Sequence, residues 1–189
     1  MKKNDFDLAR NCRECEKILP LEPRPIIQGS SKSKICIIGQ APGLAAHNTN
    51  LPWNDASGDR LRAWIGMPKT TFYDENTVAI LPMGFCYPGK AASGDLPPIK
   101  QCAEIWHQRL LSAFSPKLTL LIGQYAQNYY LKDKSNVTNR VKNWQRYLPK
   151  YIVLPHPSPR NNIWLKKNEW FEQSVLPQIK SRIQTACHS

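Results

Sequence analysis

Four short apolar runs constrain most strongly what this chain can fold into. Each is rich in β-branched residues or leucine, is bounded by Gly or Pro, and lacks the alternation of a half-exposed strand. Such runs are typical of strands that are buried on both faces of a sheet. The runs are KICIIGQ (34–40), TVAILPM (77–83), KLTLLIG (117–123) and YIVLP (151–155).

Segments with a helical spacing of apolar residues lie between and after these runs. Alternation of strand and helix indicates a parallel sheet covered by helices on both faces. The predicted fold class is therefore α/β, a three-layer α/β/α arrangement around a central four-stranded parallel sheet. A single domain over residues 1–189 is expected, because a chain of 189 residues suits one hydrophobic core. The predicted helices span 58–66, 98–114, 124–132, 141–148 and about 169–182.

Positive charge is concentrated in the last third of the chain. The protein has 26 Lys and Arg against 14 Asp and Glu, a net charge of +12. Residues 132–189 contain eleven basic and three acidic residues, and thus hold +8 of this total. Such an excess favours a polyanionic partner, with a solvated basic surface as the alternative.

No segment has the composition of a membrane span or a signal peptide. The first 20 residues lack an apolar stretch, and no run approaches the ~18 apolar residues of a span. We therefore expect a cytoplasmic monomer with no membrane partner. A structural disulfide is not expected in the cytoplasm, so the six cysteines are candidate metal ligands, catalytic groups or core residues.

Two rigid motifs follow the first and last predicted strands. GQAPGLAAHNTNLPWNDASGD (39–59) begins with a Gly-Pro-Gly turn whose backbone N–H groups can face a ligand, although such turns are often ordinary loops. HPSPRN (156–161) follows a proline and contains two more, which fix the backbone around His156. Taken alone, His156 could be a hydrogen-bonded structural residue. Because the carboxyl ends of parallel strands share one edge, both motifs should open on the same crevice.

Together these motifs resemble those of the uracil-DNA glycosylase superfamily, and the resemblance spans about Cys12 to Phe171. GQAPG is similar to the first loop of the thermostable, iron–sulfur branch, whereas HPSPRN looks more like the single-strand-selective monofunctional branch. The resemblance implies a monofunctional DNA glycosylase of base excision repair, with DNA as its partner. Its substrate would be uracil or another deaminated or damaged base.

The resemblance also implies which residues hold the base. His156 would hydrogen-bond the O2 carbonyl of the base and stabilise its developing charge. The backbone around Gln40, Ala41 and Gly43 would bind the base and the 3′ phosphate side. Trp53 stands where relatives place a Phe and would stack on the flipped base.

DNA contacts are implied for the turn that contains the histidine. Ser158 would hold a backbone phosphate, and Arg160 and Asn161 would enter or line the DNA groove. One rigid turn would then join leaving-group stabilisation to DNA binding.

Four of the cysteines match the iron–sulfur branch in their spacing. Cys12 and Cys15 form C-x2-C, 70 residues intervene, and Cys86 and Cys102 form C-x15-C. This pattern resembles the set that holds a 4Fe-4S cluster, for which four thiolates are the usual ligands. Zinc would satisfy the same ligands, and four unrelated core thiols are a third interpretation.

The first loop departs from the family pattern where water would be activated. The iron–sulfur branch has an acidic residue where this chain has Gln40 and a second where it has Ala46. His47 or Asp55 could serve as the base instead, with a slight preference for Asp55. If neither does, the chain would be a catalytically reduced iron–sulfur DNA-binding module. An enzyme acting on a small nucleotide fits the crevice but leaves the basic segment without a purpose.

The second predicted strand ends without the asparagine that reads uracil in relatives. Pro82 and Met83 stand in that neighbourhood. We therefore expect weaker selectivity for uracil than in the relatives that carry the asparagine.

Several further residues are expected to be structural. Cys36 lies in the middle of a predicted strand, and Trp64 and Trp106 fall on apolar helix faces. His107 has no partner that the sequence reveals.

Overall fold

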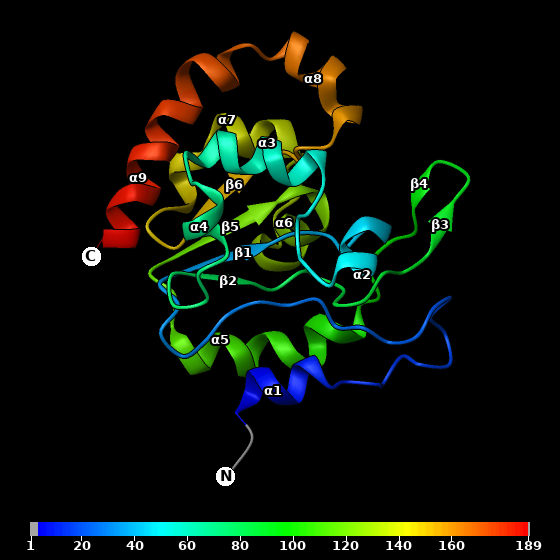
Figure 1. Cartoon of the computed structure of the whole chain (residues 1–189). Helices are drawn as coiled ribbons and strands as arrows, with labels where there is room; N and C mark the ends of the chain where they lie inside the picture. Colours follow the sequence, from blue (N-terminus) through cyan, green and yellow to red (C-terminus); the bar gives the residue numbers. More distant parts are fainter. Residues whose placement is uncertain (1–3, 189) are drawn as a thin grey trace.

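The chain folds around a four-stranded parallel sheet, as predicted. A computed structural model describes residues 4–188, and of His188 only the backbone. The strand order is β2-β1-β5-β6, and all three neighbouring pairs are parallel (Figure 1). Every residue of these four strands except Tyr151 is buried, which explains the continuous apolar runs. The strands are β1 (Ile35–Ile38), β2 (Val78–Ile80), β5 (Leu118–Ile122) and β6 (Tyr151–Leu154).

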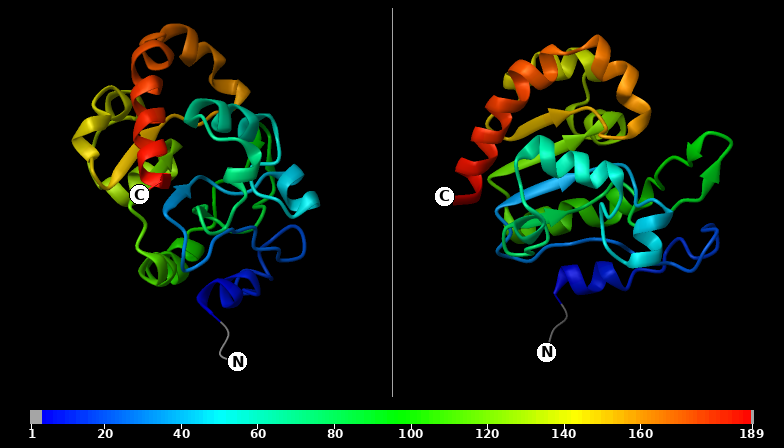
Figure 2. Two further views of the ribbon diagram at one scale, coloured as in Figure 1. Left: turned by 60° about the vertical axis from the view of Figure 1, so that its left-hand side comes forward. Right: turned by 45° about the horizontal axis from the view of Figure 1, so that its top comes forward.

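Helices cover both faces of the sheet and complete the three layers. α1 (Asp5–Arg10) and α5 (Gln108–Phe114) pack together on one side, and α3 (Ala56–Ile65) and α9 (Leu176–His188) on the other (Figures 1 and 2). α6 (Gly123–Leu131) follows β5 directly and packs against β5 and β6. The predicted α/β/α fold class is thus confirmed.

Some predicted helices have different bounds. The 98–114 segment forms a π-helical turn over Ala103–His107 before α5. The 141–148 segment instead divides between α7 (Val137–Lys142) and a 3-10 turn (Trp144–Tyr147). The last helix begins with a π-helical turn (Phe171–Val175) and continues into α9.

Several short elements were not predicted from the sequence. None of them exceeds six residues, so none repeats an apolar pattern over two helical turns or a full strand. They are α1, α2 (Leu44–Thr49), α4 (Lys69–Phe72), α8 (Asn162–Lys167) and the hairpin of β3 (Lys90–Ala91) and β4 (Gly94–Asp95).

The core lies between the sheet and its helices. Cys36 is fully buried, and Trp64 and Trp106 are 4% and 8% exposed, so all three are core residues as expected. His107 is also buried, at 1% exposure, but it is hydrogen-bonded to two partners that the sequence did not reveal. Among the described helices, none is long and apolar enough to cross a membrane.

Candidate functional site

A cavity of about 400 Å³ lies at the edge where the parallel strands end. Loops that follow β1, β2 and β6 form its walls, together with the start of α3 and the β3–β4 hairpin. The hairpin projects from the body of the molecule on this side (Figures 1 and 2). The predicted site residues that line the cavity are Gln40, Ala41, Gly43, Trp53, Asp55, His156, Ser158, Arg160 and Asn161.

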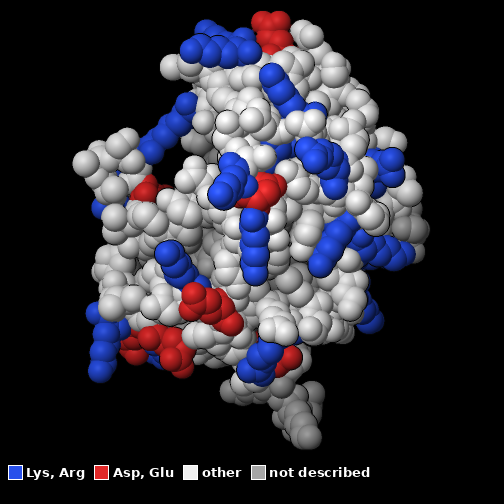
Figure 3. Space-filling view, turned by 180° about the vertical axis from the view of Figure 1, so that it is seen from behind, with Lys and Arg blue, Asp and Glu red and all other residues white. Residues whose placement is uncertain are grey.

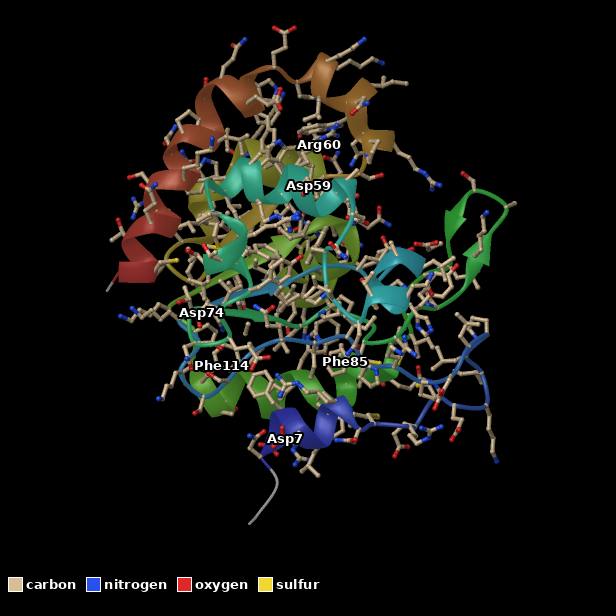
Figure 4. All side chains as sticks on the ribbon, in the orientation of Figure 1. Asp7, Asp59, Arg60, Asp74, Phe85 and Phe114 are labelled. Atoms are coloured by element: carbon tan, nitrogen blue, oxygen red, sulfur yellow. The ribbon has the colours of Figure 1, made fainter. Side chains whose placement is uncertain are left out.

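Hydrogen bonds make the turn after β6 rigid. Asn161 Nδ2 donates to the carbonyl oxygen of His156 at 2.7 Å, and Ser158 Oγ accepts from the backbone N–H of Arg160 at 3.3 Å. Arg60, on α3, donates from Nη1 to the carbonyl oxygen of Ser158 at 3.2 Å. Figure 4 labels Arg60 on the side of α3 that faces this turn. The turn is therefore held by its own side chains and by a neighbouring helix.

The same turn determines the proton position on His156. The backbone N–H of Ser158 lies 3.2 Å from His156 Nδ1, so Nδ1 must be the acceptor. Burial lowers the pKa of His156, and the negative charge of Asp55 offsets only part of this. The imidazole is therefore neutral near pH 7, with its proton on Nε2. A neutral imidazole in this tautomer can donate a hydrogen bond to a ligand oxygen.

Trp53 faces His156 across the cavity. The two ring centroids lie 5.6 Å apart with an interplanar angle of 34°. Trp53 has φ of 55°, a left-handed backbone that a bulky side chain rarely adopts. Arg62 Nη1 donates to its carbonyl oxygen at 3.2 Å. A Cβ atom at Gly39 would lie 2.7 Å from the indole, so the ring packs directly on the backbone of the first loop.

The loop after β1 is attached to the loop after β2. The backbone N–H of Met83 donates to the carbonyl oxygen of Gly39, and that of Gly84 to Gln40, each at 3.0 Å. These bonds fix the backbone that runs from Gln40 to Gly43 along the cavity. The loop after β1 and the loop after β2 therefore form one rigid wall.

The two candidate water-activating residues lie in different places. Asp55 lines the cavity and caps α3, because its Oδ1 accepts from the backbone N–H of Gly58 at 2.8 Å. His47 is not among the residues that line this cavity. It is 7% exposed, and its ring centroid lies 6.2 Å from that of Tyr87. Geometry therefore favours Asp55, and the role itself stays a prediction.

The hairpin brings two residues to the cavity that were not predicted. Gly94 and Asp95, on β4, both line it. A Cβ atom at Gly94 would overlap the guanidinium of Arg160, so this arginine extends from its turn across to the hairpin. The sequence signal for the hairpin was weak, because each strand contains only two residues.

The four predicted ligand cysteines come from three parts of the chain and are all free thiols. Burial raises the pKa of Cys86 to about 11, with smaller increases from the charges of Cys12 and Cys15, whereas a backbone hydrogen bond at Arg24 opposes the shift. Burial and the charges of the other three raise the pKa of Cys102 to about 12. The four are thus close enough to interact electrostatically. Among the described side chains, no group of three or more His, Cys, Asp or Glu could hold a metal ion, so the metal site stays a prediction.

Basic side chains are spread widely over the surface. Seen from behind, Lys and Arg form patches scattered over a face that is otherwise mostly uncharged, whereas Asp and Glu are fewer and several lie in the lower part of the view (Figure 3). The same view shows a hollow beside the projecting hairpin. A surface of this kind, together with the net charge of +12, suits a polyanion.

A comparison with known families agrees with this site. The family model for the uracil DNA glycosylase superfamily matches residues 26–180, which include the whole sheet and every element that lines the cavity. The chain belongs to the uracil DNA glycosylase superfamily. Membership supports a DNA glycosylase-type function, and DNA as the partner.

Proposed function

We propose that this protein is a monofunctional DNA glycosylase of base excision repair. It would hydrolyse the N-glycosidic bond of uracil, or of another deaminated or damaged base, after the base has left the stack. The observation that carries the proposal is the pair of His156 and Trp53 in one cavity. Their rings lie 5.6 Å apart at the edge where the strands end.

His156 would stabilise the departing base. As the glycosidic bond lengthens, negative charge develops on the base oxygen, and the Nε2–H of the neutral ring would donate to it. A donor placed in this way is typically worth roughly 3 to 4 kcal/mol in the transition state. Ser158 N–H holds the opposite ring nitrogen at 3.2 Å, so the donor is oriented before the base arrives.

Trp53 and Asp55 would act on the base and on the attacking water. The indole of Trp53 would stack on the flipped base, which suits its fixed position against Gly39. Asp55 Oδ1 is engaged by Gly58, whereas Oδ2 accepts no hydrogen bond from a described residue and would orient water. Ser158, Arg160 and Asn161 would then hold the DNA backbone or its groove.

The four cysteines would hold a structural 4Fe-4S cluster, with a zinc ion as the alternative. Support comes from four free thiols, of which Cys12, Cys15 and Cys86 all raise the pKa of Cys102 through their charge. Thiolate ligands suit either group. The cluster would join the N-terminal segment to the loop after β2 and to the start of the π-helical turn.

A catalytically reduced DNA-binding module remains the second candidate. The observation in its favour is Gln40, because an amide in the first loop cannot take a proton from water. The carboxylate of Asp55 is also partly engaged as a helix cap. This candidate predicts DNA binding without base release.

Single-turnover excision from oligonucleotides that each carry one altered base would test the proposal. His156→Ala should lose roughly 100-fold or more in rate, because the lost donor acts mainly in the transition state. Binding to undamaged DNA should hardly change. Excision at the wild-type rate by His156→Ala would remove the catalytic assignment, and no excision of any base by the wild type would favour the binding module.

A matched pair of variants would test the activation of water. Asp55→Asn keeps a helix cap and should lose about 100-fold in rate if the carboxylate orients water. His47→Gln should excise nearly as fast as the wild type, since His47 does not line the cavity. The reverse pattern would assign water activation to His47.

A further inference from the structure

A buried histidine lies directly behind the inner wall of the base cavity. His107 is 1% exposed, and its Nε2 lies 3.0 Å from the carbonyl oxygen of Pro82. Its Nδ1 lies 2.6 Å from the hydroxyl of Tyr130. The imidazole is stacked between the rings of Phe85 and Tyr130, with centroid distances of 5.8 and 6.0 Å. Figure 4 labels Phe85 on the side of the sheet where α5 lies.

The hydrogen bonds define the protonation of this ring. A carbonyl oxygen can only accept, so Nε2 carries the proton and donates to Pro82. Burial lowers the pKa of His107 to about 4, so the ring is neutral near pH 7 and Nδ1 has no proton. Tyr130 must therefore donate its hydroxyl proton to Nδ1. Both nitrogens are satisfied in one arrangement only.

Pro82 belongs to the cavity wall, whereas His107 does not. The lining includes Pro82 together with the buried side chains of Ile26 and Ile80, but not His107. Because the Pro82 carbonyl is bonded to a residue behind the wall, it is directed away from the cavity. Proline also has no N–H. At Pro82 the wall therefore presents ring carbons and no hydrogen-bonding group.

An exposed acceptor here would matter for selectivity. Cytosine, adenine and guanine carry exocyclic amino groups that donate hydrogen bonds, whereas uracil and other deaminated bases carry oxygen at those positions. A free carbonyl on the wall would accept from an amino group and repel an oxo group. Sequestering the carbonyl removes this advantage from the three normal bases that carry an amino group.

We propose that His107 is a positioning residue that keeps the Pro82 carbonyl out of the base cavity, so that oxo bases are taken in preference to amino bases. Tyr130 donates to the other ring nitrogen and so holds the imidazole in position against Pro82. The inference rests on the proposed function for the nature of the ligand, which is a base flipped from DNA. It also explains how a pocket without a reading asparagine can still disfavour cytosine.

Binding and excision would be measured separately. The binding arm uses single-stranded oligonucleotides with one 2′-fluoro-2′-deoxyuridine or one 2′-fluoro-2′-deoxycytidine, whose glycosidic bonds resist cleavage. The excision arm uses deoxyuridine and deoxycytidine in the same sequence. In the binding arm the quantity of interest is the association constant for the uracil oligonucleotide divided by that for the cytosine oligonucleotide. In the excision arm it is the corresponding ratio of the two rate constants. The binding ratio reports on the cavity even where no bond is broken.

His107→Phe keeps a planar ring and removes the donor. The Pro82 carbonyl then loses its partner, so the Pro82–Met83 peptide is held only by the bond from Met83 N–H to Gly39 and can turn its carbonyl toward the cavity at the cost of that bond. The uracil-to-cytosine ratio should fall about 10-fold, as expected for one hydrogen bond gained by cytosine. His107→Gln retains an N–H donor of similar reach and should keep the ratio near that of the wild type.

Two neighbouring tyrosines provide a matched control. Tyr130→Phe removes the hydroxyl that holds the imidazole in position against Pro82 and should lower the ratio. Tyr129 also meets His107, with a centroid distance of 6.3 Å, but its hydroxyl makes no hydrogen bond to it. Tyr129→Phe should therefore leave the ratio unchanged.

The outcomes separate this inference from the proposed function. A folded His107→Phe protein with the wild-type ratio would overturn the inference, as would a wild type that binds both oligonucleotides equally. If His107→Phe does not fold, equal ratios for Tyr130→Phe and Tyr129→Phe would overturn it. A wild type that prefers uracil in binding but excises nothing would contradict the proposed function alone.

Discussion

The stability of the protein should fall steeply as the pH is lowered below 6.5 because of His107, and His107→Gln should remove that part of the fall. The folded state disfavours the protonated ring, whose pKa is lowered by burial to about 4 from the usual 6.5. As the pH falls below 6.5, His107 binds a proton in the unfolded chain but stays neutral in the folded chain. The free energy of unfolding therefore decreases from pH 6.5 downward and levels off below pH 4.

The size of this contribution follows from the pKa difference. One pKa unit corresponds to about 1.4 kcal/mol, so the full effect is on the order of 3 kcal/mol. Between pH 7 and pH 4.5 the wild type should lose about 2.5 kcal/mol more than His107→Gln. This is a large fraction of the net stability of a typical domain.

Urea unfolding of the wild type and His107→Gln at several pH values would measure this difference in the free energy of unfolding. Both proteins share the cysteines, His47 and His156, so acid effects at those groups cancel in the difference. The two proteins should converge in stability as the pH falls, or the variant should become the more stable one. Parallel curves, with a difference that does not vary with pH, would refute the burial of a neutral imidazole at this position. The measurement needs no substrate and is independent of the proposed activity.

Two further predictions concern the cysteines and the DNA surface. Protein purified without oxygen should be brown and contain iron with acid-labile sulfide, and Cys86→Ser should lose both; stoichiometric zinc without sulfide, from cells supplied with iron, would instead favour zinc. DNA affinity should fall steeply with salt, and Arg160→Ala should reduce the log–log slope by about 0.9 if Arg160 neutralises one phosphate of duplex DNA. An unchanged slope would limit Arg160 to its packing against Gly94.

The sheet and the place of the site could be predicted because both depend on local patterns. Strands buried on both faces appear as continuous apolar runs, and parallel strands bring their carboxyl ends to one edge. This was enough to bring the first loop and the HPSPRN turn to one cavity. The arrangement of His156 opposite Trp53 adds a distance and an angle, which no spacing in the sequence contains.

The parts that could not be predicted depend on short elements and distant contacts. α2 forms within the long first loop and turns His47 toward Tyr87 instead of the cavity. The β3–β4 hairpin brings Asp95 to the cavity through strands of two residues each. His107 meets partners 23 and 25 residues away in the chain, beyond the reach of any local pattern. Its sequence position on an apolar helix therefore gave no sign of a functional contact.

The missing acid in the first loop is less damaging to a glycosylase mechanism than it is for most hydrolases. Glycosidic cleavage passes through a transition state in which the sugar carries positive charge before water has bonded fully. Water then needs orientation and a nearby negative charge more than a strong base. Asp55 would supply both the orientation and the negative charge, because the backbone N–H of Gly58 fixes one of its carboxylate oxygens and the residue lines the cavity. The larger demand falls on the leaving base, where His156 lies with its donor already oriented by Ser158. Under the proposed mechanism we therefore expect a chain with Gln40 to keep turnover as long as His156 is neutral, a state that burial favours by lowering its pKa.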